Sequence, residues 1–321
     1  MIKHILVPLD GSELAECVLP HVMAVAPVTN ARITLAHVME HSHHDGRAPV
    51  TDPVDWNLRK RESKIYLEKI AGRLQKSDIS IEHTLLEGSP AESIIEFARN
   101  NNVDLIALST HGRSGLSGWN VSSVVYKILQ RSSKSTLLIR AYKPTSENKA
   151  DVYFKRLFVG LDCSPRAEYI LPIAIDLAQY YNSQLILGTV IQRPQTCQRF
   201  PLSGEDDDLV NQIVKKNQQA ASHYFDQLHR QFSPKKLELK TNIVVGDNAI
   251  TCLHDMVKEV DADLVMLVAH GHSGARRWLY GSVTSSFITY GNTALMIMQD
   301  LTDDEIQRTL DEMAVREGKG Y

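Results

Sequence analysis

The sequence predicts an α/β protein of two tandem doubly wound domains, each with a five-stranded parallel sheet flanked by helices. Three observations lead to this prediction. The chain has 321 residues, about twice the usual length of one domain. Two blocks of sequence occur twice, in the same order. Short apolar runs alternate with helical patterns, which is typical of parallel sheets with crossover helices.

The repeat is long and colinear. The segment His4–Ser12 (HILVPLDGS) returns as Arg156–Ser164 (RLFVGLDCS), and Asp104–Gly115 (DLIALSTHGRSG) returns as Asp263–Gly274 (DLVMLVAHGHSG). The offsets are 152 and 159 residues, far longer than the period of a solenoid repeat. The chain is therefore a duplicated domain.

The boundary between the halves falls at the short polar stretch 143–152, which resembles a linker. We expect a first domain at 1–146, a second at 152–300 and an acidic C-terminal tail at 301–321.

Each half contains five expected strands and four expected helices. Continuous runs of Ile, Leu and Val predict strands that are covered on both faces. The strands are expected at 3–9, 32–38, 79–86, 104–109 and 136–141, then 156–161, 184–190, 237–245, 263–269 and 294–298. The helices are expected at 13–27, 56–77, 90–101 and 118–131, then 165–181, 206–232, 248–259 and 279–290.

Composition excludes several classes of protein. Hydrophobic residues make up 43% of the chain and charged residues 23%, as in ordinary globular proteins. The net charge of −3 argues against specific nucleic-acid binding. No apolar run approaches the length of a membrane-spanning helix, and residues 1–20 do not resemble a signal peptide. Four scattered cysteines fit a reducing compartment, so we expect a cytoplasmic protein without a structural zinc site.

An aspartate follows the first strand of each half. Asp10 and Asp162 would lie at the carboxyl end of a parallel strand, where doubly wound sheets bind their ligands. A carboxylate there could accept a hydrogen bond from a ligand hydroxyl or amino group. The alternative is a helix N-cap, a role that Ser12 and Ser164 could also serve.

A glycine-rich turn follows the fourth strand of each half, at 111–115 and 270–274. Glycines allow phosphates to approach backbone N–H groups, and the next helix offers its N-terminus to an anion. The alternative is an ordinary tight turn. Neither the P-loop pattern nor the dinucleotide pattern is present.

Together these motifs resemble the universal stress protein family. The resemblance rests on VPLDGS at 7–12, GSP at 88–90 and STHGRSGL at 109–116, and it covers residues 1–300. Two such domains resemble the tandem members. The family implies the strand order 3-2-1-4-5, pairing of the two halves through their last strands, and in many members ATP or AMP binding.

The family's phosphate motif is a glycine, two residues, a glycine, nine residues, then Gly-Ser or Gly-Thr. In the second half the resemblance implies a site in which the first glycine is lost to Val268. In the first half both the first and the late glycine are lost. The second-half positions are Val268, His270, Gly271, Gly274, Gly281, Ser282 and Val283; the first-half positions are Ser109, Gly112, Gly115, Ser122 and Ser123.

The residues that the resemblance implies around the adenine favour the first half instead. The implied contacts are Pro8, Asp10 and Val38 in the first half and Gly160, Asp162 and Val190 in the second. The first half keeps the family's proline and Gly11. On balance we expect one occupied site in the second half, with AMP in the first half as a possible second site and Mg²⁺ as a possible companion.

Other signals have both functional and structural explanations. His41, His43 and His44 could bind a metal ion, although an irregular loop is the expectation. The histidines of the glycine-rich turns could touch phosphate or simply hold the turn. Cys163 could be reactive, but a small buried residue is the expectation.

No catalytic constellation is apparent, so the chain is not expected to be a dedicated enzyme and at most a weak ATPase. The leading hypothesis is a cytoplasmic tandem stress protein that binds ATP or AMP and acts through conformation or partner choice. The alternatives are a nucleotide-free interaction or chaperone-like protein and a slow ATPase. The sequence leaves open the trigger, the protein partner and the oligomeric state, which could be a homodimer.

Overall fold

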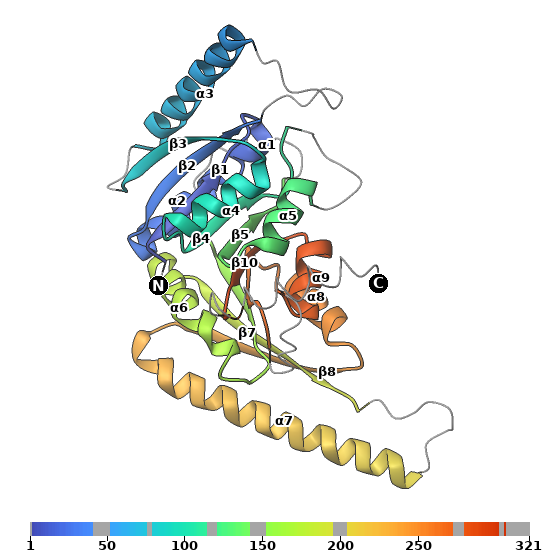
Figure 1. Ribbon diagram of the computed structural model, residues 1–321. Coiled ribbons are helices and arrows are strands. Elements are labelled where there is room, and N and C mark those ends of the chain that lie inside the picture. The colour runs from blue at the N-terminus through green and yellow to red at the C-terminus, as the bar shows by residue number, and fades with distance from the viewer. Residues whose placement is uncertain are drawn as a thin grey trace, which may run out of the picture. The chain divides into compact units, whose positions relative to one another are not determined.

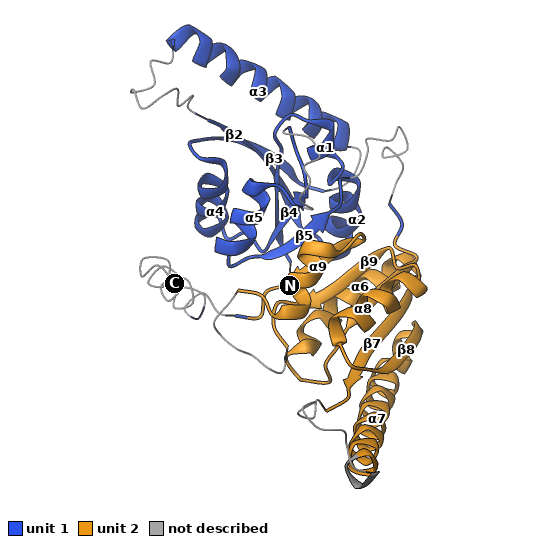
Figure 2. Ribbon diagram, turned by 90° about the vertical axis from the view of Figure 1, so that its right-hand side faces the viewer, with its two compact units in different colours: residues 1–153, 301–321 blue, residues 154–300 orange. Residues whose placement is uncertain are grey.

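A computed structural model describes residues 2–40, 52–75, 79–113, 121–141, 152–194, 204–271, 279–301 and 305. The chain divides into two compact units, coloured separately in Figure 2. Unit 2 comprises residues 154–300 and unit 1 the remainder. The His41–Asp45 cluster, most of the tail, Gly115 and Gly274 lie outside the described residues.

Unit 1 contains a parallel five-stranded sheet of the predicted class. β1 pairs with β2 on one side and with β4 on the other, β3 pairs with β2, and β5 pairs with β4. The order β3-β2-β1-β4-β5 agrees with the order that the family resemblance implies. The elements are β1 (His4–Pro8), α1 (Glu13–Glu16), α2 (Leu19–Thr29), β2 (Arg32–Met39), α3 (Pro53–Leu74), β3 (Ile81–Glu87), α4 (Pro90–Asn100), β4 (Leu105–Ser109), α5 (Ser123–Arg131) and β5 (Ser135–Ile139) (Figure 1).

Unit 2 repeats this arrangement. Its strands pair in the order β8-β7-β6-β9-β10. Its elements are β6 (Arg156–Gly160), η2 (Ala167–Ile170), α6 (Leu171–Tyr181), β7 (Gln184–Gln192), α7 (Gly204–Phe232), η3 (Ser233–Lys235), β8 (Glu238–Gly246), α8 (Ala249–Glu259), β9 (Leu264–Val268), α9 (Ser282–Tyr290) and β10 (Ala294–Met298).

The apolar runs are buried as predicted. Every residue of β4, β5 and β9 is buried, because helices cover both faces of the sheet at these strands. Connections between parallel strands are right-handed, so the connections from β1 to β3 and from β3 to β5 place their helices on opposite faces. The order of strands reverses between β1 and β4, which makes the carboxyl ends of these strands the expected ligand site.

The helix expected to start at residue 56 begins at Pro53, and the helix expected to start at residue 279 begins at Ser282. Two other predicted helices are interrupted near their starts. The segment 13–27 is not one helix: α1 ends at Glu16, and α2 begins at Leu19 and continues to Thr29. The segment 165–181 begins as the 3₁₀ turn η2 before α6. Pro20 and Pro172 explain both corrections, because proline lacks the N–H that would continue the preceding helical turn.

No helix in the described part of the chain has the length and apolarity needed to cross a membrane. Among the same residues there is no group of three or more histidine, cysteine or carboxylate side chains arranged to hold a metal ion.

Candidate functional site

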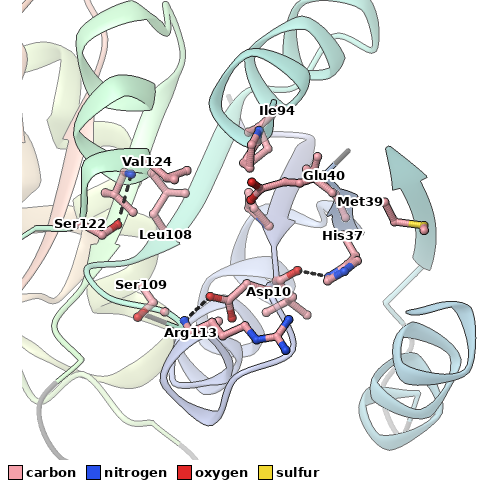
Figure 3. A pocket seen from close by; sticks show the side chains of 18 of the residues that line it. Asp10, His37, Met39, Glu40, Ile94, Leu108, Ser109, Arg113, Ser122 and Val124 are labelled. Carbon is pink, nitrogen blue, oxygen red and sulfur yellow. Dashed lines mark hydrogen bonds between the residues drawn. The ribbon is translucent and has the colours of Figure 1, made fainter. Parts of the chain in front are cut away.

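A cavity of about 810 Å³ opens at the carboxyl ends of β1, β2 and β4 in unit 1 (Figure 3). It lies at the switch point of the sheet, where ligands of doubly wound folds bind. It brings together all the described residues that the sequence assigned to the first half: Pro8, Asp10, Val38, Ser109, Gly112, Ser122 and Ser123. Its volume is in the range of small-molecule sites, roughly 300–1,000 Å³.

Asp10 joins two loops at the edge of this cavity. One carboxylate oxygen accepts hydrogen bonds from the backbone N of Ser12 at 3.0 Å and from the Ser12 hydroxyl at 2.6 Å. The other accepts one from the backbone N of Arg113. Ser12 in turn caps α1 by accepting from Ala15 N. Asp10 therefore holds the β1 loop against the loop after β4, and Ser12 is the helix cap.

Gly112 is required for that contact. A Cβ at this position would lie 3.0 Å from Cγ of Asp10 and would overlap its Oδ2. In unit 2 a Cβ at Gly271 would likewise overlap Oδ2 of Asp162. The repeated glycine and the repeated aspartate are thus two parts of one contact, which we call the Asp–Gly latch.

The N-terminus of α5 lines one end of the cavity. Ser122 caps the helix by accepting from Val125 N at 3.4 Å, and its own N–H donates to Thr110 O at 2.8 Å. The first-turn residues Ser123 and Val124 also line the cavity. In unit 2, a Cβ added to Gly281 would meet nothing closer than 3.5 Å. The serine at the matching position of the first half is therefore sterically acceptable.

One wall of the cavity comes from α3 and was missed by the sequence analysis. Trp56, Arg59, Glu62 and Ser63 line the cavity, yet no side chain of α3 before Leu67 is buried. Trp56 is the aromatic residue of this wall, and Arg59 pairs with Asp55 at 2.9 Å. Trp56, Ser63, Leu67 and Ile70 share one helical face, so their spacing is the signal that could have identified the wall.

Other unpredicted lining residues come from the end of β2. His37 Nδ1 donates a hydrogen bond to Leu9 O at 2.7 Å, and its ring packs edge-on to Tyr66, with the ring centroids 6.3 Å apart. The Tyr66 hydroxyl donates to Glu16 at 3.2 Å, and burial together with this carboxylate raises the pKa of Tyr66. The further lining residues that the sequence analysis did not assign include Met39, Glu40, Pro90, Ile94 and Leu108.

Both turn histidines are held by neighbours. His111 Nδ1 is 3.1 Å from Thr110 Oγ1, and His270 Nδ1 is 2.9 Å from Asp300 Oδ1; both residues are buried. These contacts favour the role of fixing the turn. Cys163 is half-buried with φ 61°, and burial raises the pKa of its thiol, which disfavours the reactive thiolate.

The predicted residues of the second half lie at or near the carboxyl ends of β6, β7 and β9 and at the start of α9. A Cβ added at Gly160 would lie 2.6 Å from Leu267 Cδ2, so a larger residue there would require the Leu267 side chain to shift. Val268 accepts from the Thr284 hydroxyl at 2.9 Å through its carbonyl, and Gly281 N donates to Ala269 O at 2.7 Å. These contacts place Gly271, Gly281, Ser282 and Val283 near the carboxyl end of β9; Val190 lies in β7.

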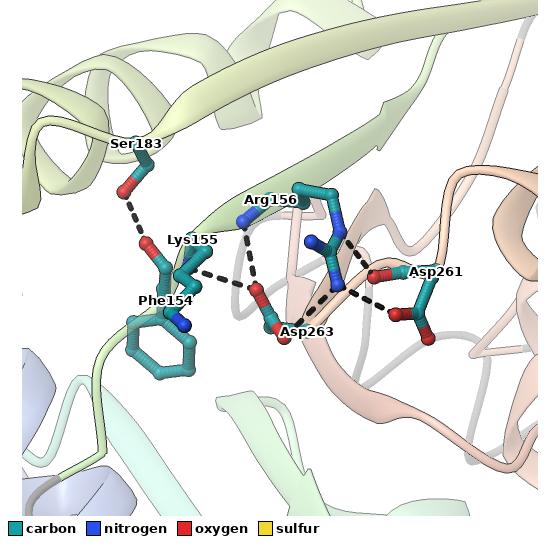
Figure 4. Close-up of polar contacts among 6 residues, drawn as sticks. All are labelled: Phe154, Lys155, Arg156, Ser183, Asp261 and Asp263. Atoms are coloured by element: carbon teal, nitrogen blue, oxygen red, sulfur yellow. Dashed lines mark hydrogen bonds and ion pairs between the residues drawn. The ribbon is translucent and has the colours of Figure 1, made fainter.

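The repeated aspartate before β4 and β9 lies at the opposite edge of each sheet. Asp263 accepts hydrogen bonds from the backbone N of Lys155 at 2.8 Å and of Arg156 at 2.7 Å (Figure 4). Asp104 does the same for Lys3 and His4. These aspartates tie neighbouring strands together at their amino ends, and they are structural.

Comparison with known proteins agrees with this architecture. The model of the universal stress protein family matches residues 1–140 and 153–298. Universal stress protein MJ0531 of Methanocaldococcus jannaschii is 28% identical over 146 residues, which cover 45% of this chain and 85% of that protein. Universal stress protein MJ0577 of the same organism is 27% identical over 155 residues, covering 44% and 96%.

A solved structure extends the likeness to the full length. The crystal structure of a universal stress protein from Archaeoglobus fulgidus superposes with a TM-score of 0.65 at 16% identity, covering 93% of this chain and 98% of that one. At this identity the likeness concerns the fold alone. The two family matches nevertheless span most of the sequence, and the chain therefore belongs to the universal stress protein family, as a member with two tandem domains.

Proposed function

We propose that the protein binds one adenine nucleotide in the unit 1 cavity and acts in the stress response through conformation or partner choice. The observation that carries the proposal is the convergence of all seven described first-half residues on one cavity. This choice of half differs from the preference that the motif glycines suggest.

The apolar part of the cavity suits a purine base. Pro8, Val38 and Ile94 contribute apolar surface, and Trp56 adds an aromatic side chain on the α3 wall. Asp10 and Glu40 supply carboxylate oxygens that can accept hydrogen bonds from sugar hydroxyls or an exocyclic amine.

The phosphates would lie at the N-terminus of α5. The first turn of a helix has unpaired N–H groups and the positive end of the helix dipole, and both favour an anion. Ser123 and Val124 provide this turn, and Arg113 brings a cation to the same cavity. ATP, ADP and AMP are all candidates, with Mg²⁺ accompanying the longer phosphates.

The cavity favours binding over catalysis. Asp10 already accepts hydrogen bonds from three donors, so it is poorly placed to act as a general base. We therefore propose that the chain is not a dedicated enzyme and is at most a weak ATPase. Phosphate release by the full chain, compared with a Gly112→Ala variant, measures this directly.

The binding experiment uses calorimetric titration of the full chain with ATP, ADP and AMP, with and without Mg²⁺. Trp56→Ala is expected to weaken binding about tenfold, because an aromatic contact of about 1.4 kcal/mol corresponds to that factor. Leu58→Ala is the matched control: Leu58 is on the same helix, 55% exposed and not part of the cavity lining, so binding should not change.

The same titration separates the alternatives. Loss of binding in Ser282→Ala, with no effect of Trp56→Ala, would move the site to the second half. No binding heat in any buffer, with no change in thermal stability at millimolar nucleotide, would favour the nucleotide-free interaction or chaperone-like protein.

A cytoplasmic location, pairing of the two halves within the chain and a homodimer remain predictions. Light scattering of the full chain measures the oligomeric state, and cell fractionation measures the location.

A further inference from the structure

A buried carboxylate in unit 2 is surrounded by hydrogen-bond donors. Asp300 follows β10, and its side chain is 3% exposed. Oδ1 accepts from the backbone N of His270 at 3.1 Å and lies 2.9 Å from the imidazole Nδ1 of the same residue. Oδ2 pairs with Nε of Arg166. We call these three residues the Asp300 cluster.

The donors of this cluster are those that bind oxyanions. A backbone N–H, an imidazole and a guanidinium are the usual partners of carboxylate and phosphate oxygens in proteins. The cluster lies at the carboxyl ends of β9 and β10. It is also close to the start of α9. Gly281, which precedes this helix, donates its N–H to the carbonyl of Ala269, and Ala269 is the residue before His270.

The first half lacks the cluster. At the repeat offsets, Arg166 corresponds to Leu14 and Asp300 to Ala141. There the histidine of the turn contacts the Thr110 hydroxyl, and that same hydroxyl accepts from Ala141 N at 3.0 Å. The first half thus holds its turn with a neutral threonine, whereas the second half uses a charged carboxylate.

We infer that the second half contains an oxyanion site, for a carboxylate or a phosphate group, that the chain's own Asp300 occupies. The backbone N–H and imidazole of His270 are buried and need an acceptor, and the partly exposed guanidinium of Arg166 adds a positive charge beside them. Arg166 is 29% exposed, so this side chain connects the cluster with solvent. This inference concerns unit 2 and does not depend on nucleotide binding in unit 1.

The experiment removes the internal anion and supplies an external one. In the full chain, Asp300→Ala is expected to lower the melting temperature by about 10 °C, as for loss of a buried charged partner. Formate at 100 mM should then raise it by about 3 °C or more relative to chloride at equal ionic strength, because a ligand of the native state alone stabilises it. Inorganic phosphate is the second probe. A larger rise in melting temperature with phosphate than with formate would indicate a site for a phosphate group, and the reverse would indicate a site for a carboxylate.

Asp300→Leu is the matched control. It also removes the carboxylate, but its side chain fills the space, so formate and chloride should give equal melting temperatures. The wild-type chain, whose site is occupied, should also show no difference between the two anions.

Two results would overturn the inference. One is an Asp300→Ala variant that responds to formate no more than Asp300→Leu does. The other is an Asp300→Asn variant as stable as the wild type, since the amide keeps the shape but not the charge. If Asp300→Ala is recovered folded only when formate is present, that outcome supports the inference.

Discussion

Replacement of Gly112 by alanine tests the Asp–Gly latch. The added Cβ would overlap Oδ2 of Asp10, so the carboxylate must move away from Arg113 N. A hydrogen bond to a charged acceptor contributes about 1.5–3 kcal/mol. We therefore expect Gly112→Ala to lower the free energy of unfolding by about 2 kcal/mol, or the melting temperature by about 4–8 °C.

The same change should weaken nucleotide binding. Asp10, Gly112 and Arg113 all line the cavity, and displacement of the carboxylate moves both loops that it joins. A loss of 1.4 kcal/mol corresponds to tenfold, so we expect the dissociation constant to rise about tenfold or more. Thermal unfolding and calorimetric titration of the same preparations measure the two effects.

The repeat provides an internal control. Gly271→Ala meets Asp162 in the same way, so it should lower stability by a similar amount without changing the affinity of unit 1. Gly72→Ala, in α3, meets nothing within 4 Å and should stabilise the chain by about 0.5–1 kcal/mol. The reasoning is refuted if Gly112→Ala is as stable as Gly72→Ala, or if it binds nucleotide with unchanged affinity.

Three further changes test the local geometry. Cys163 has φ 61°, a strained conformation for a residue with a Cβ, so Cys163→Gly should raise the free energy of unfolding by about 1 kcal/mol in thermal denaturation. Burial lowers the pKa of His4 and His21, so the unfolded state binds protons more readily; stability in urea should fall as pH drops below about 6.5, with a smaller slope in His4→Gln. Tyr66→Phe removes the hydrogen bond to Glu16 and should cost about 1 kcal/mol in the same urea experiment.

The sequence predicted the sheet well because buried parallel strands leave a strong local signal. β4 and β9 are each five consecutive buried residues, all apolar except Ser109, and each strand is followed by a histidine and a glycine two and three residues later. The repeat then showed that the chain contains two such domains. The starts of the helices were harder to predict, because Pro20 and Pro172 interrupt helical patterns that otherwise continue through these positions.

The site was only partly predictable from the sequence. Asp10 and Gly112 were each identified as candidate site residues, but their contact joins residues about a hundred positions apart. The α3 wall was missed because Trp56 lies in none of the motifs that carry the family resemblance. Arg166 and Asp300 were missed because the matching residues of the first half are Leu14 and Ala141, so the repeat does not mark these positions.

The choice of a half as the nucleotide site depends on two effects: a steric effect of the motif glycines and an electrostatic effect of Asp300. The motif glycines favour nucleotide binding in the second half, but their only effect is to leave space for a phosphate group near the backbone. An added Cβ at Gly281 would meet no protein atom closer than 3.5 Å, so the protein around this position leaves room for the serine found in the first half. A phosphate reaching the donors of His270 would instead have to displace Asp300, and it would lose the hydrogen bonds and the ion pair that Asp300 already makes there. We therefore propose that Asp300 disfavours phosphate binding in the second half, and that the first half, whose turn is held by a neutral threonine, is the better place for a nucleotide.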